Sequence, residues 1–169
     1  QDEGATWELS YDLSYVSSNH FTINDNNRIF IFNHYNHRLF YSDDNGDTWQ
    51  EQASGISGNP TNLIEGMYSL SNDTIVMVNN EKFFWTLDGG ESWNETNISF
   101  LQDMVFASIL ADHAGNVYIS ITNAVPIYEL GIYTANLNDI DNWTWLIEGA
   151  FINHMELYPE GNVVAGGYG

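Results

Sequence analysis

The chain has 169 residues, of which 23 are Asp or Glu and only 3 are Lys or Arg, giving a formal net charge of −20. Three cations cannot neutralise a phosphate backbone, which argues against nucleic-acid binding, and no apolar run approaches the roughly 20 residues of a membrane span. Aromatic residues make up 15% of the chain, which excludes a disordered acidic tail, and the absence of Cys excludes disulfides.

Short β-branched and aromatic runs, separated by Asn- and Gly-rich turns, predict β-strands along the whole chain. A lone strand at residues 7–10 comes first. Three periods of four strands follow, at 21–24, 28–33, 38–42 and 48–52, then 66–71, 74–79, 82–87 and 92–96, then 105–111, 116–122, 131–135 and 143–148. A final pair is predicted at 153–159 and 162–166. No stretch keeps a 3.6-residue period, so we expect very little helix.

A motif of the form [S/T]-x-D-x-G-x-[S/T]-W joins the third and fourth predicted strands in two of the periods. The first copy consists of Ser42, Asp44, Gly46, Thr48 and Trp49, and the second of Thr86, Asp88, Gly90, Ser92 and Trp93. A clipped copy has Asp2, Gly4, Thr6 and Trp7, and a degenerate copy has Asn136, Asn138, Ile140 and Asn142 before Trp143. The tryptophans recur at intervals of roughly 40 to 50 residues, which is typical of propeller repeats.

The chemistry of the motif predicts a tight hairpin turn. Its Asp is expected to accept hydrogen bonds from backbone N–H groups, and its Gly to adopt a positive φ. The leading Ser or Thr caps the same turn, while the Trp begins the next strand and packs between neighbouring sheets. We therefore predict that Asp44 and Asp88 occupy equivalent turns and that Trp49 and Trp93 are mostly buried.

These residues resemble the Asp-box, or BNR repeat, of sialidase-like β-propellers, and the resemblance covers nearly the whole chain. It implies an all-β Asp-box propeller with about three and a half four-stranded blades, as one domain that is part of a larger ring. The periods are residues 1–10 (a closing strand), 11–53, 54–97, 98–148 and 149–169. In that family the box is a structural turn on the face away from the ligand sites.

The strand count suggests an incomplete ring, because the last period has only two predicted strands. The remainder of the same propeller chain is then one expected partner. A closed four-bladed ring is the alternative, if residues 7–10 join the last blade. Gln1 suits a mature N-terminus after signal cleavage as well as an arbitrary boundary. If Gln1 is a mature N-terminus, the protein is expected to be secreted or displayed at the cell surface.

Candidate binding residues lie in the loops between second and third strands, which we place on the face opposite the boxes. They are His34, Tyr35, His37, Glu81, Tyr128 and Glu129. His34 and His37 suit metal ligands, but no third ligand has a diagnostic spacing, so an ordinary polar loop is the alternative. The loop with Tyr128 and Glu129 suits a sugar or peptide contact, and a neutral surface insertion is the alternative.

We expect no cofactor. The turns with Asp43, Asp44 and Asp25 are rich in oxygen ligands that suit Ca²⁺, but neither follows the EF-hand order, and turn capping explains Asp44 and Asp88. A sialidase of the resembling family needs three clustered arginines, whereas the chain has only Arg28 and Arg38. No pair of glycosidase carboxylates can be assigned by spacing.

The sequence therefore predicts a secreted, non-catalytic propeller that binds or displays a glycan or protein. One alternative is the N-terminal segment of a propeller glycoside hydrolase, which is the enzyme class expected if the chain is catalytic. Another alternative is an assembly factor that docks a protein partner.

Overall fold

The computed structural model describes residues 20–33, 38–52, 56, 64–79, 81–98, 105–123 and 130–168. These residues form β-strands and turns, without a helix among them. The part of the chain described here therefore contains no helix able to cross a membrane. The all-β class predicted from the strand pattern is confirmed.

The strands form four antiparallel sheets in chain order, which we call blades 1 to 4. Blade 1 consists of β1 (Phe21–Ile23), β2 (Ile29–Asn33), β3 (Arg38–Ser42) and β4 (Gln50–Glu51). Blade 2 consists of β5 (Gly66–Ser69), β6 (Ile75–Val78), β7 (Lys82–Thr86) and β8 (Asn94–Asn97). Blade 3 consists of β9 (Val105–Ala111), β10 (Asn116–Asn123), β11 (Gly131–Asn136) and β12 (Asp139–Glu148). Blade 4 has β13 (Phe151–Leu157) and β14 (Val163–Tyr168) in the described residues.

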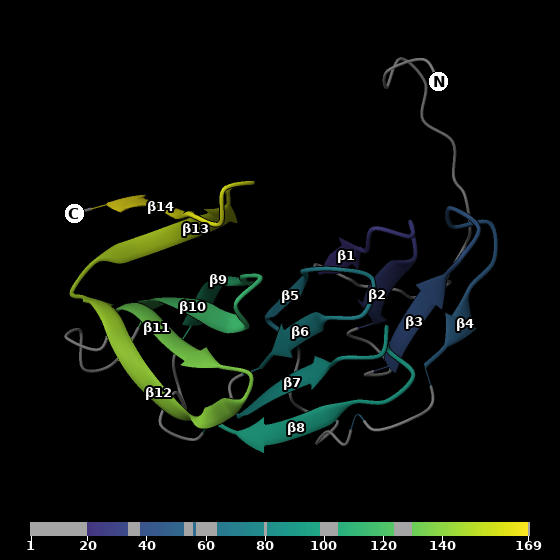
Figure 1. The fold of residues 1–169 in the computed structure, drawn as a ribbon, viewed down its shortest axis with the longest axis horizontal. Coiled ribbons are helices and arrows are strands. Elements are labelled where there is room, and N and C mark those ends of the chain that lie inside the picture. Colours follow the sequence, from purple (N-terminus) through teal and green to yellow (C-terminus); the bar gives the residue numbers. More distant parts are fainter. Residues whose placement is uncertain are drawn as a thin grey trace, which may run out of the picture.

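The blades are arranged radially, as in a β-propeller (Figure 1). The first strands β1, β5, β9 and β13 lie innermost, and each contacts the next one around the arc. The last strands β4, β8 and β12 lie on the periphery. Because each strand pairs with its neighbour in sequence, a blade needs only short hairpin turns.

Apolar side chains on alternate strand positions fill the space between adjacent blades. Val76 and Val78 of β6 face blade 3, whereas Ile75 and Met77 of the same strand face blade 1. All four side chains are fully buried, since β6 has a blade on each side. This two-sided burial explains why β6 is a continuous apolar run rather than an alternating one.

Several strand boundaries differ from the prediction, and four strands begin two or more residues from the expected position, among them β13, which begins at Phe151 rather than at residue 153. β4 and β8 begin at Gln50 and Asn94, two residues later than expected, because the last motif residues still belong to the turn. β12 begins at Asp139, four residues earlier than expected. Here a short turn at residues 137–138 replaces the motif, and its Asn138 N–H donates to Asn136 Oδ1 at 3.0 Å. The predicted strand at residues 7–10 lies outside the described part of the chain.

The two kinds of turn share one face of the propeller, which we call the box face. In blade 2 the Gly89 N–H of the motif turn donates to Asp73 O of the first hairpin at 2.9 Å. In blade 3 the Leu137 N–H donates to Gly115 O at 2.8 Å. The loops between second and third strands are therefore on the opposite face, as the strand order predicts.

Candidate functional site

The two intact motifs fold into the same hydrogen-bonded turn. Asp44 Oδ1 accepts from the Thr48 N–H at 2.8 Å, and Oδ2 accepts from the Thr48 hydroxyl at 2.5 Å. Asp88 makes the equivalent contacts with Ser92, at 2.9 and 2.5 Å. The leading hydroxyl of each motif accepts from the glycine N–H, at 2.8 Å for Gly46 and 3.0 Å for the second motif.

Electrostatics within the motifs follows from these contacts. Hydrogen bonds from Ser92 and Thr86 lower the pKa of Asp88 to about 2, and those from Thr48 and Ser42 lower the pKa of Asp44 in the same direction. Donors that bind the ionised form of a carboxylate stabilise that form. Both carboxylates are thus occupied by their own turns.

The tryptophans that follow the motif turns of blades 2 and 3 face the preceding blade. Trp93 of blade 2 is 7% exposed and belongs to the cluster with Phe30 and Leu39 of blade 1. Trp143 of blade 3 packs its ring at 5.6 Å from Phe83 of blade 2. Trp49 of blade 1 is intermediate in exposure, so it is mostly buried, as predicted, but less completely than Trp93. In the described residues no blade lies on that side of blade 1, which explains the difference.

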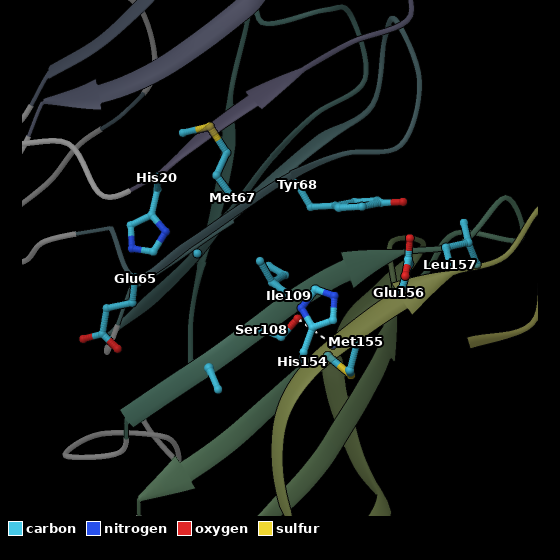
Figure 2. A pocket seen from close by; sticks show the side chains of 12 residues that line it. His20, Glu65, Met67, Tyr68, Ser108, Ile109, His154, Met155, Glu156 and Leu157 are labelled. Carbon is cyan, nitrogen blue, oxygen red and sulfur yellow. Dashed lines mark hydrogen bonds between the residues drawn. The ribbon is translucent and has the colours of Figure 1, made fainter. Parts of the chain in front are cut away.

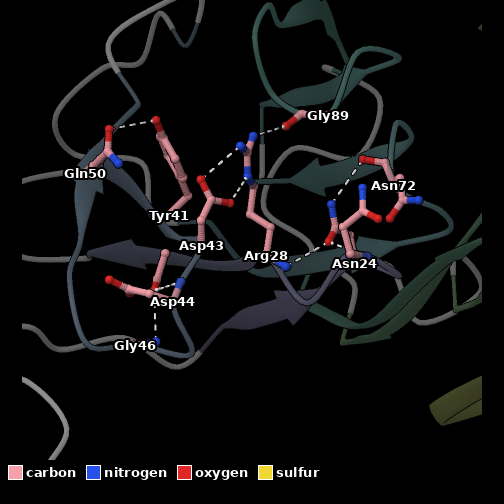
Figure 3. Close-up of polar contacts among 11 residues, drawn as sticks. Asn24, Arg28, Tyr41, Asp43, Asp44, Gly46, Gln50, Asn72 and Gly89 are labelled. Carbon is pink, nitrogen blue, oxygen red and sulfur yellow. Dashed lines mark hydrogen bonds and ion pairs between the residues drawn. The ribbon is translucent and has the colours of Figure 1, made fainter.

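All three Lys and Arg side chains form salt bridges within their own blades. Arg28 pairs with Asp43 at 2.6 Å, Arg38 with Glu51 at 2.6 Å, and Lys82 with Glu95 at 2.5 Å. Arg28 also donates to Gly89 O of blade 2 at 3.2 Å and lies over the Tyr41 ring (Figure 3). The cations therefore hold strands and blades together, and no cation is left over for the remaining carboxylates.

The two oxygen-rich turns considered for Ca²⁺ are also occupied. Asn24 Oδ1 accepts from the N–H groups of Asn26 and Arg28 at 3.1 and 2.9 Å, and Asn24 Nδ2 donates to Asn72 O (Figure 3). Asp43 is held by Arg28. The described residues contain no group of three or more His, Asp or Glu side chains placed to hold a metal ion.

A pocket of about 430 Å³ lies among the innermost strands, where the blades converge (Figure 2). Its lining is partly apolar and partly polar, with two carboxylates and two histidines but no Lys or Arg. The lining residues are His20, Glu65, Gly66, Met67, Tyr68, Ala107, Ser108, Ile109, His154, Met155, Glu156 and Leu157. Pockets of this size and mixed lining are typical of ligand sites.

The repeat places equivalent positions of each blade around this pocket. The first hairpin of every blade closes with the same backbone hydrogen bond, donated by Asn24, Leu70, Asp112 and Tyr158 in blades 1 to 4. Counting back four residues from each donor gives His20, Gly66, Ser108 and His154, and all four line the pocket. Gly66 allows the close approach of Ile109, because a Cβ at Gly66 would lie 2.7 Å from Ile109 Cγ2. Ser108 Oγ accepts a hydrogen bond from the Met155 N–H at 3.1 Å.

Glu65 is one of two pocket residues, with Tyr68, whose pKa is raised. It is half-buried, and burial raises the pKa of its carboxyl group. The Phe106 N–H donates to Glu65 Oε2 at 3.4 Å, which only partly offsets this effect. A carboxylate that has lost water without gaining a strong partner is available to a ligand.

Tyr68 and Glu156 lie at the other end of the pocket. Burial raises the pKa of Tyr68, and the negative charges of Asp25 and Glu156 raise it further. Figure 2 shows the Tyr68 hydroxyl directed toward Glu156. The side chain of Glu156 is exposed. A ligand in the pocket therefore meets an aromatic ring and a carboxylate together.

Comparisons with known proteins agree with this architecture. The BNR/Asp-box repeat family matches residues 40–51, which include the first motif. The chain carries an Asp-box repeat on a β-propeller fold. Curated protein sequences yield no match.

Among solved structures, this propeller is similar to YCF48 bound to D1 peptide, with 17% identity and a TM-score of 0.66 over 89% of this chain and 48% of that one. A streptogramin B lyase has 11% identity and a TM-score of 0.66 over 92% and 49%. An extracellular domain from B. thetaiotaomicron has 13% identity and a TM-score of 0.61 over 99% and 23%. The chain thus spans about half the length of the first two structures, and these likenesses show the fold alone.

Most of the binding residues predicted for this propeller lie outside the described part of the chain. These are His34, Tyr35, His37, Tyr128 and Glu129. The structural residues of the clipped motif, Asp2, Gly4, Thr6 and Trp7, also lie outside the described residues. Glu81 is described and lies in the second-to-third turn of blade 2. Its N–H donates to Asn79 Oδ1 at 2.9 Å, and it does not line the pocket. The structure therefore does not bring Glu81 to the pocket residues.

The pocket residues themselves were missed by the sequence reasoning, which examined only loops and turns. His20, Glu65, His154 and Glu156 lie on or next to innermost strands that are far apart in the chain. Alignment of the periods on their first hairpins would have placed His20 and His154 at the same position. No local spacing marks Glu65 or Glu156.

Proposed function

We propose that the chain is a non-catalytic binding scaffold, which holds a protein or glycan ligand in the pocket of its innermost strands. The observation that carries the proposal is this pocket, in which Met67, Ile109 and Met155 supply apolar contact area beside a few polar groups. A small number of polar groups on an apolar wall orients a ligand and gives specificity. The similar YCF48 structure holds a peptide, which supports a protein ligand.

Extracellular display is part of the same proposal. The similarity to an extracellular domain supports it. The net charge of −20 favours solubility of a displayed protein. Detection of the chain in the culture medium or at the cell surface of the source organism would test this location, and retention inside the cell would contradict it.

Blocking the pocket tests the binding site. His154 is exposed and lines the pocket, so His154→Trp should fill the pocket without disturbing the core. His113 is exposed in the first hairpin of blade 3, outside the pocket, and His113→Trp is the matched control. Ligands are first selected on peptide and glycan arrays, and their affinities are then measured by calorimetry.

We expect His154→Trp to weaken binding of the selected ligands at least about tenfold and His113→Trp to leave it unchanged. Equal affinities of the two variants would refute the pocket as the binding site. Failure of every arrayed peptide and glycan to bind would refute the scaffold function itself.

One observation favours a second candidate, the propeller glycoside hydrolase. Glu65 and Glu156 line one pocket, and the raised pKa of Glu65 suits a general acid. Glycosidases use two carboxyl groups that face each other across the bond to be cleaved. Hydrolysis of a polysaccharide panel, abolished by Glu65→Gln in a folded protein, would favour this candidate over the scaffold. We expect no turnover.

A further inference from the structure

The pocket carries two carboxylates, Glu65 and Glu156, that form no salt bridge with a Lys or Arg of the chain. All three Lys and Arg side chains form salt bridges on the hairpins of blades 1 and 2, and none of them lines the pocket. Glu65 is half-buried with only the 3.4 Å contact from the Phe106 N–H. A buried or half-buried carboxylate is stabilised when a cation pairs with it.

The two carboxylates lie at different depths. Glu65 is five residues before Leu70, which closes the first hairpin of blade 2, whereas Glu156 is two residues before Tyr158, which closes that of blade 4. A difference of three strand positions corresponds to about 10 Å along the strand direction. Figure 2 accordingly shows Glu65 and Glu156 at opposite ends of the lining.

Between these depths lie the polar level of His20, Ser108 and His154 and, next to it, an apolar level. Met67, Ile109 and Met155 each lie three residues before the closing residue of their hairpin, so they form one level of the pocket. This level lies next to that of Tyr68 and Glu156. The ring of Tyr68 adds an aromatic surface on which a cation is attracted. The order of groups along the pocket is therefore the Glu65 carboxylate, the level with the two histidines, the apolar level, and the Glu156 carboxylate beside an aromatic ring.

We propose that the ligand of this pocket is dicationic, with two ammonium or guanidinium groups separated by an apolar stretch. Glu65 pairs with one cationic group, and Glu156 with Tyr68 receives the other. This inference rests on the proposed binding function and specifies the ligand class. A peptide segment with two basic side chains and an aliphatic polyamine share this chemistry.

Calorimetry with defined probes tests the proposal and separates the two sources. The peptide probe is acetyl-Lys-Ala-Lys-amide, the polyamine probe is spermidine, and the monocationic control is acetyl-Lys-Ala-Ala-amide. Tighter binding of the peptide identifies a peptide ligand, and tighter binding of spermidine identifies a polyamine. We expect the monocationic control to bind about tenfold more weakly than the better dication, because it engages only one carboxylate.

Charge-neutral variants assign the two sites. Glu65→Gln and Glu156→Gln should each weaken the better dication about tenfold. Glu160→Gln removes the same charge from the exposed first hairpin of blade 4, outside the pocket, and should change affinity less than about twofold. Circular dichroism of each variant establishes that it is folded.

Equal losses in all three variants would overturn the proposal, since they would indicate general attraction to an acidic protein. The proposal would also be overturned if neither dication binds, or if the Glu65→Gln and Glu156→Gln variants bind the dications as tightly as the unsubstituted protein does. If His154→Trp nevertheless weakens binding of the ligands selected on the arrays, the scaffold function stands and only the prediction of a dicationic ligand is wrong. If they do not, the scaffold function itself is wrong.

Discussion

Replacing Trp93 by Ala should destabilise the protein far more than the same change at Trp49. Trp93 is 7% exposed and fills the cluster between blades 1 and 2, against Phe30 and Met77. Trp49 has the same position in its motif but is partly exposed, and its indole N–H donates to Gly46 O at 3.1 Å. The pair therefore separates packing between blades from the contribution of the motif hairpin.

Truncation of a buried Trp to Ala typically costs about 3–5 kcal/mol, because a cavity remains where the ring was. Trp49→Ala should cost only about 1–2 kcal/mol, from partial burial and one hydrogen bond. For a domain of this size, each kcal/mol lowers the melting temperature by about 2–4 °C. Trp93→Ala should thus lower it by about 6–20 °C.

Urea unfolding followed by circular dichroism measures both variants without relying on the fluorescence of the ring removed. An unchanged slope with a lower midpoint indicates a change in stability rather than in compactness. Equal costs for Trp93→Ala and Trp49→Ala would refute the reasoning, because they would place the contribution of each tryptophan within its own hairpin.

Three further predictions concern the turns and the pocket. Gly90 has a φ of +93°, and a Cβ there would lie 3.1 Å from the Phe30 ring. Gly90→Ala should therefore lower the free energy of unfolding by about 1–2 kcal/mol or more. Gly166 has open space where a Cβ would lie, so Gly166→Ala is the control and should leave the free energy of unfolding unchanged. The pKa of Asp88 is lowered to about 2, so its contribution to stability is present above the ordinary value of 3.8 and is lost as the pH falls toward 2. Asp88→Asn should flatten that acid limb in unfolding midpoints measured between about pH 2 and 5. The raised pKa of Glu65 makes stability depend on pH in the opposite direction. Folding disfavours the charged form of Glu65, so the free energy of unfolding falls as the pH rises through the pKa of the folded state. Glu65→Gln should therefore raise the melting temperature at pH 7 and have little effect at pH 4, and a lower melting temperature at pH 7 would contradict this account.

The strands and the motif turns were predictable from the sequence because their determinants are local. Asp88 contacts residues two and four positions away, and Thr86 caps the same turn, so eight consecutive residues specify the hairpin. Short runs rich in β-branched and aromatic side chains, bounded by turn residues, likewise mark the strands locally. Where the motif degenerates near Asn138, the local signal is lost, and the predicted start of β12 was wrong by four residues.

The pocket was decided only by the tertiary structure. Glu65 lies next to β5 of blade 2 and Glu156 lies on β13 of blade 4, two blades further along the chain. Only the radial packing of β5, β9 and β13 brings them to one cavity. The same holds for the burial of the motif tryptophans, since Trp93 is covered by blade 1 whereas no described blade covers Trp49. Burial and charge compensation depend on which surfaces meet in space, and a repeat in the sequence specifies each unit without specifying what lies beside it.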